Sequence, residues 1–173
     1  MKQKITGFAY KLIIIVLLGA FLYESGLFGV VNHKIEQDAR SSQQINADWQ
    51  VSSEKVNAVI AMLFYDDIYR SHVYSLYVQK NALFGTYLFK AGGQSPFIAD
   101  SVLQIETEDQ VIYLSMNYLR IKRLVIDYGQ TVQEQNIDQF RPFVWIAPAN
   151  SIVSFYDEND RIINVVPEKI RIE

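Results

Sequence analysis

The chain lacks cysteine entirely and has only two histidines and four prolines among its 173 residues. Without cysteine, a disulfide scaffold and a lipid anchor on a cysteine side chain are both excluded. With His33 and His72 as the only histidines, a histidine-rich metal site is excluded as well. The formal net charge of −3 argues against binding of nucleic acid or anionic lipid through bulk electrostatics.

Catalytic and cofactor motifs are lacking too. Gly92-Gly93 lacks the lysine and the following helix of a phosphate-binding loop, so it predicts a turn. No strand–turn–helix nucleophile elbow accompanies His72. The acidic run Asp157–Asp160 offers oxygens for calcium, but its position between two apolar segments is more typical of a hairpin turn. We therefore expect no catalytic residue, no metal and no cofactor.

What the chain does have is one uncharged apolar run, Leu12–Tyr23, which three lysines precede. Apolar residues on both sides extend it to a helix near residues 8–31, long enough for the roughly 20 residues that a membrane span needs. Lysines before the run and mixed charges after it predict a cytoplasmic N-terminus. We expect a single-pass anchor over residues 1–31, with the rest of the chain outside the cell.

Three other interpretations of this segment stay open. A cleaved signal peptide has the same order of charge and apolar residues, but Tyr23-Glu24-Ser25 places a bulky ring where a small residue is needed. A buried helix of a soluble protein is the second. A pilin-like assembly subunit is the third, because Gly7-Phe8 precedes the run. Pilin-like proteins carry a glutamate five residues after the processed glycine, and this chain has Leu12 there.

The rest of the chain divides into a polar segment and a strand-rich domain. Residues 32–50 have a thin apolar stripe at helical spacing, which predicts a partly helical stalk. Residues 51–173 contain short apolar and aromatic runs separated by turn residues, which predict an all-β domain, an antiparallel sandwich or open barrel. Strands are expected at Val56–Tyr65, His72–Lys80, Leu83–Lys90, Val102–Glu106, Val111–Met116, Arg123–Tyr128, Phe143–Ala147, Ile152–Tyr156 and Arg161–Ile163.

Aromatic residues are abundant, with 11 tyrosines, 10 phenylalanines and 2 tryptophans. Alternation along a strand sends successive side chains to opposite faces, so some rings line the core and others face solvent. An exposed aromatic face suits sugars or an extended peptide. The alternative is that the rings pair across the sheet for stability alone.

The strand Ile152–Tyr156 is the candidate binding edge. Its hairpin partner Arg161–Ile163 is short, and Pro167 prevents a long continuation. A partner strand that adds there would bond to the backbone. The speculative binding residues, all on this strand, are Ser154, Phe155 and Tyr156. Alternatively, the charges at Arg161 and in the acidic turn only protect the edge from such pairing.

Three stretches carry a resemblance to known proteins: Tyr74–Tyr87, Gly92-Gly93 and Phe155–Arg161. They resemble small, single-anchor, extracytoplasmic β-rich proteins of Gram-positive bacteria with no assigned activity. The resemblance implies an envelope location and no functional residue.

These patterns predict a non-enzymatic, membrane-anchored extracytoplasmic binding or accessory module. Its expected partners are the membrane, through the N-terminal helix, and an envelope protein or polymer, with no nucleic acid. The alternative is an envelope hydrolase whose site forms only in three dimensions. A cleft that gathers His72, a serine and a carboxylate would favour the hydrolase.

Overall fold

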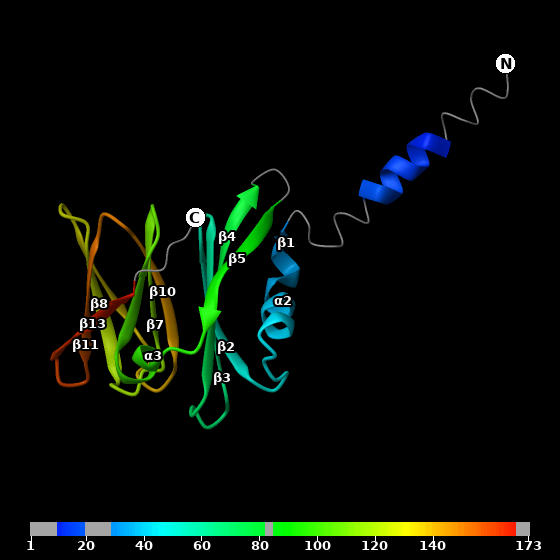
Figure 1. Cartoon of the computed structure of the whole chain (residues 1–173). Helices are drawn as coiled ribbons and strands as arrows, with labels where there is room; N and C mark the ends of the chain where they lie inside the picture. Colours follow the sequence, from blue (N-terminus) through cyan, green and yellow to red (C-terminus); the bar gives the residue numbers. More distant parts are fainter. Residues whose placement is uncertain (1–9, 20–28, 82–84, 169–173) are drawn as a thin grey trace, which may run out of the picture.

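The computed structural model describes residues 10–19, 29–81 and 85–168. Strands dominate the described part of the chain (Figure 1), so the prediction of an all-β domain is confirmed. Two short α-helices accompany the strands within the β body: α2 (Ile35–Ser42), which follows the 3-10 turn η1 (Asn32–Lys34), and α3 (Pro96–Asp100).

The strands form three sheets, which we call sheets A, B and C. Sheet A has the order β1 (Val30–Val31), β5 (Thr86–Gly93), β4 (His72–Asn81), β3 (Val59–Tyr65) and β2 (Gln50–Val56). Sheet B has the order β10 (Phe143–Pro148), β7 (Gln110–Ser115), β6 (Val102–Glu106) and β13 (Val165–Glu168). Sheet C has the order β12 (Ile162–Ile163), β11 (Ile152–Asp157), β8 (Ile121–Asp127) and β9 (Val132–Asn136). All pairings are antiparallel except β6 with β13.

The sheets and α2 stack as four layers in the order α2, A, B, C, which Figure 1 shows across the view. Leu63 and Leu76 of sheet A pack against Leu114 of sheet B. The other face of sheet B packs on sheet C, where Phe155 is fully buried. The other face of sheet A is covered by α2 through Ile35.

This layering accounts for the unbroken apolar runs of β3 and β7. Every residue of both strands is buried, because each lies inside a sheet that is covered on both faces. Alternation of apolar and polar residues is typical of a strand with one solvated face. Its absence from Val59–Tyr65 is therefore the sequence signature of a central layer.

The helix expected in the stalk is present as α2, and it lies on sheet A. Ile35 and Ala39 are buried against the sheet, and the Tyr77 hydroxyl donates to Asp38 Oδ2 at 2.6 Å. The guanidinium of Arg40 lies 4.9 Å from the centre of the Phe64 ring. The segment predicted as a stalk, residues 32–50, therefore forms a layer of the β body, because its thin apolar stripe is enough to cover a sheet face.

The predicted anchor is described only in part. Residues 10–19 are helical, and the side chains of Leu12–Leu18 are 46–66% exposed. Among the described residues, no helix is both long enough and apolar enough to span a membrane. The rest of the predicted anchor, residues 1–9 and 20–28, lies outside the described residues.

The end of the predicted anchor, Val30–Val31, is a strand. Val30 pairs with Tyr87 and Val31 with Thr86 in sheet A. Gly29 precedes them at φ +97°, and a Cβ there would lie 2.7 Å from the carbonyl oxygen of Tyr87. Only glycine fits such a close approach of two backbones. The expected helical boundary at residue 31 is therefore corrected: the β body already includes Val30.

Hydrogen bonds join sheets A and B. Gln110 Nε2 of β7 donates to the carbonyl oxygen of Val56 in β2 at 3.1 Å, and a further bond links the edge strands β2 and β10. The backbone N–H of Ile146 in β10 donates to Glu54 Oε2 of β2 at 2.8 Å. Burial raises the pKa of the Glu54 carboxyl to about 7, and the bond from Ile146 offsets this only in part. Pro148 in the same strand has no N–H to donate. The carboxylate and the proline together leave this edge few donors for a foreign strand.

The substitution Glu54→Gln replaces this carboxyl group by its neutral isostere and tests the contact between sheets A and B. The folded pKa of about 7 exceeds the ordinary 4.5, so the folded state binds more protons than the unfolded chain between these values. The contribution of Glu54 to the free energy of unfolding therefore falls as the pH rises from 4.5 to about 7. We expect E54Q to be about 1–2 kcal/mol more stable than the unsubstituted protein at pH 8, after allowance for partial exposure. Urea unfolding at pH 8 and pH 4 measures this; an equal difference at both pH values would contradict it.

Candidate functional site

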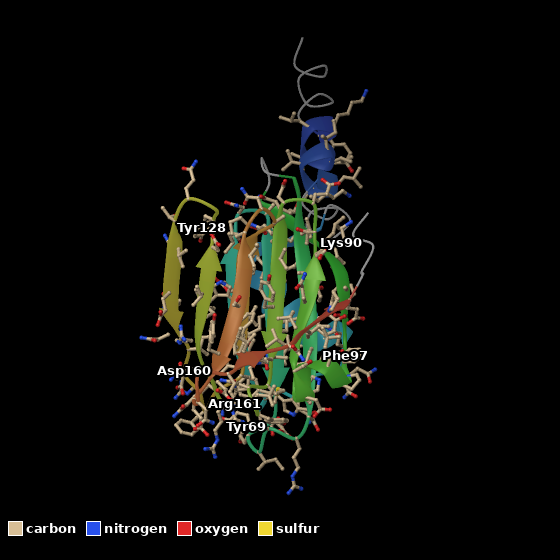
Figure 2. The ribbon with its side chains drawn as sticks, turned by 90° about the vertical axis from the view of Figure 1, so that its left-hand side faces the viewer. Tyr69, Lys90, Phe97, Tyr128, Asp160 and Arg161 are labelled. Atoms are coloured by element: carbon tan, nitrogen blue, oxygen red, sulfur yellow. The ribbon has the colours of Figure 1, made fainter. Side chains whose placement is uncertain are left out.

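Exposed apolar side chains gather at one end of the stack, at the connections β3–β4, β7–β8 and β9–β10 and at α3. We call this end the loop surface. In Figure 2, Tyr69 and Phe97 lie at this lower end together with the β11–β12 turn, whereas Tyr128 lies at the other. Its exposed apolar members are 38–66% exposed: Ile68, Phe97, Tyr118, Leu119 and Phe140.

The β3–β4 connection presents Ile68 from a closed loop. Asp66 Oδ1 accepts from the backbone N–H of Arg70 at 2.6 Å, and the N–H of Tyr69 donates to the Asp66 carbonyl oxygen at 3.0 Å. Tyr69 adopts φ +55°, and its ring stacks on Tyr65 with centroids 5.4 Å apart. The loop is thus fixed at its base by side-chain and ring contacts, and Ile68 is left at the tip.

The β7–β8 connection is held by Asn117, which is only 4% exposed. Its Oδ1 accepts from the N–H of Ile121 at 2.7 Å, and its Nδ2 donates to the carbonyl oxygens of Ile121 at 3.2 Å and Asp138 at 3.0 Å. Asn117 and Arg120 both have positive φ, +59° and +53°. One buried amide therefore fixes the loop that exposes Tyr118 and also ties it to the β9–β10 connection.

Contacts between loops link the β7–β8, β9–β10 and β11–β12 connections at this end. The guanidinium of Arg120 lies 6.0 Å from the centre of the Phe140 ring and 3.4 Å from Glu158 Oε2. Partial burial, followed by the charges of Asp66 and Asp100, raises the pKa of the Tyr118 hydroxyl. These charges come from the β3–β4 loop and α3. Residues of all three sheets thus meet around Tyr118 and Arg120.

The acidic turn at the same end is bonded internally. Asp157 Oδ1 accepts from the N–H groups of Asn159 and Arg161, both at 2.8 Å. Asp160 pairs with Lys122 at 3.1 Å and Arg123 at 3.2 Å, and the hydrogen bonds from these two side chains lower its pKa. The turn is the hairpin connection β11–β12. Within the part of the chain that the structure describes, no group of three or more His, Asp or Glu side chains is placed to hold a metal.

The three predicted binding residues lie on β11, in different surroundings. Phe155 is fully buried between sheets B and C, with its ring centre 5.1 Å from that of Tyr113. It is a core residue, which corrects its assignment as a specificity residue. Tyr156 is half-buried with the Arg123 guanidinium 4.0 Å from its ring centre, and Ser154 pairs with Val125.

β11 is also less open than expected for an edge. β8 pairs along its whole length on one side, and β12 pairs with Phe155 and Tyr156 on the other. The sequence showed the short partner β12, but it could not show that β8, which lies far along the chain, occupies the first side.

His72 makes a structural bond. Its Nε2 lies 2.8 Å from the carbonyl oxygen of Ser95, and the residue is 9% exposed. Among the described residues, no serine hydroxyl and no carboxylate forms a hydrogen bond with this ring. The bond ties the start of β4 to the residue that precedes α3.

Comparisons of this chain with known protein families, with characterised proteins and with solved structures find no match. They therefore neither support nor oppose the resemblance to small envelope proteins of Gram-positive bacteria. Function has to be inferred from the geometry of the molecule itself.

The loop surface was not predicted from the sequence. A signal was present, because Ile68, Tyr118, Leu119 and Phe140 are apolar residues in segments that otherwise have the composition of turns. Clustered apolar residues on exposed loops are a common feature of interaction surfaces.

Asn117→Ala tests how the loop surface is held. It removes three hydrogen bonds and leaves a residue with a Cβ at positive φ, so we expect a loss of about 2–4 kcal/mol in the free energy of unfolding. Asn117→Gly removes the same bonds but relieves the backbone, so its loss should be smaller by about 1 kcal/mol. Urea unfolding of the three proteins measures both. Equal losses would contradict the role of the backbone angle.

Proposed function

We propose that this protein is a non-enzymatic binding or accessory module of the cell envelope, anchored by its N-terminal segment with the β body outside the cell. The loop surface carries the proposal. Four of its five exposed apolar side chains lie on loops that hydrogen bonds and ring contacts hold in place, and the fifth, Phe97, lies on α3. A rigid scaffold with an exposed apolar patch on its loops is the usual form of a recognition site.

A protein fits this surface better than a sugar. Ile68 and Leu119 are aliphatic, and the surface combines them with Tyr118, Phe140 and Arg120. Aromatic residues and arginine are enriched at protein interfaces, where they supply most of the binding energy. The surrounding aspartates and arginines would form the polar rim of such an interface.

The order of elements favours an arrangement in which the loop surface lies far from an N-terminal anchor. β1, the first strand of the β body, pairs with the beginning of β5, whereas α3 follows the end of β5. Because β5 has eight residues, β1 and α3 lie about 25 Å apart along the direction of this strand. An anchor that precedes Gly29 would therefore hold the body by the end opposite to Phe97, leaving the loop surface open to partners.

An envelope hydrolase receives less support from the site. A hydrolase of the serine type needs a base in contact with its nucleophile, and His72 bonds to a backbone carbonyl instead.

Photo-crosslinking in the cells that make the protein tests the binding role. A benzoylphenylalanine at position 140 should form a discrete adduct with a second protein, because Phe140 is 66% exposed on the loop surface. Val132 is the matched control, since it is 65% exposed on an edge strand at the other end. Adducts at both positions, or at neither, would contradict the proposal.

Thiol labelling in intact cells tests the placement. The native chain has no cysteine, so an introduced cysteine is the only thiol that the reagent can label. Asn150 lies exposed in the β10–β11 turn, and Asn150→Cys should react with a membrane-impermeant maleimide before lysis. Gln3→Cys should react only after lysis. The reverse pattern would contradict the orientation, and labelling of neither residue before lysis would contradict the location.

A further inference from the structure

The first half of β11 has a free edge. Ile152, Val153 and Ser154 pair with β8 on one side, and within the described residues no strand pairs with them on the other. β12 covers only the next two residues because it is two residues long. Alternate N–H and C=O groups of Ile152–Ser154 therefore face outward, and Ile152 is 70% exposed.

A groove of about 360 Å³ opens beside this edge, between sheets B and C. Ile152 and Val153 form one wall, and Gln104, Glu106 and Tyr113 from β6 and β7 line the other side. The groove adjoins the β10–β11 and β6–β7 turns, at the end of the stack opposite to the loop surface. It is therefore separate from the proposed recognition site.

The groove is acidic. Among the described residues, Glu106 is the only charged residue that lines it. Its Oε1 accepts from Gln104 Nε2 at 2.9 Å, and among the described residues it has no ion-pair partner. Burial, followed by the charge of Glu106, raises the pKa of the Tyr113 hydroxyl to about 12, so the phenol stays neutral. The carboxylate and the phenol oxygen can both accept a hydrogen bond from a cation.

We propose that the free edge of β11 binds an extended peptide segment of a partner protein and that the acidic groove takes a lysine or arginine side chain of that segment. The peptide adds to sheet C beside Ile152–Ser154, in the position that a longer β12 would fill. Its backbone bonds supply affinity, and the ion pair with Glu106 supplies selectivity. β10, an edge strand of sheet B, is less suited to strand addition. Its Ile146 N–H already bonds to Glu54, and Pro148 has no N–H to donate.

The full-length protein can be tested with a defined probe. The probe is a capped nonapeptide of alternating threonine and valine with a central lysine, and its counterparts carry norleucine or glutamate at that position. We expect saturable binding of the lysine peptide by calorimetry, about tenfold weaker binding by Glu106→Gln, and unchanged binding by Glu108→Gln. Glu108 is the matched control, because it is an exposed acid two positions along that does not line the groove.

Amide hydrogen exchange separates strand addition from charge attraction alone. Saturating lysine peptide should slow exchange within Ile152–Ser154 by at least tenfold. Binding without this protection, equal affinity for the glutamate peptide, or no binding at millimolar peptide would each overturn the proposal. Protection of the same amides without peptide, rising with protein concentration, would assign the edge to a second copy of the chain and overturn it as well.

Discussion

The arrangement of the molecule depends on covering both faces of sheets A and B. β3 and β7 bury every side chain, so neither sheet could tolerate water on either face. α2 is needed on the outside of sheet A for this reason, and sheet C is needed on the outside of sheet B. Burial of apolar area in the clusters between these layers is the main driving force for this arrangement.

This layering decides which surfaces remain for function. Both faces of sheets A and B and the inner face of sheet C are committed to packing, so the loops, the unpaired strand edges and the outer face of sheet C remain accessible. The loops have been fixed at some energetic cost: Tyr69, Asn117 and Arg120 have positive φ, which non-glycine residues rarely adopt. Such angles persist where surrounding contacts impose them, and Gln44 and Asn57, which are not part of the loop surface, adopt them as well.

The sequence predicted the apolar strands but not the polar strands β2 and β9, the short strands β1 and β13, or the arrangement of the sheets. The expected strands Val56–Tyr65, Val111–Met116 and Ile152–Tyr156 were recognisable from β-branched and aromatic runs between turns, because those signals are local. The three-sheet stack and the parallel pairing of β6 with β13 depend on contacts between distant residues. Of the candidate binding residues, Phe155 proved to be core, since alternation defines two faces without saying which is inside. The loop surface depends on four connections that meet in space.

Sheets A and B share one core, and we expect them to unfold together. Native-state amide hydrogen exchange of the full-length protein tests this directly. The amides of β3 and β7 should exchange slowest of all and with the same opening free energy, because Leu63 and Leu114 belong to one packed cluster. Exchange from β3 at a markedly lower opening free energy than from β7 would contradict it, since sheet A would then be a separate unit resting on the rest.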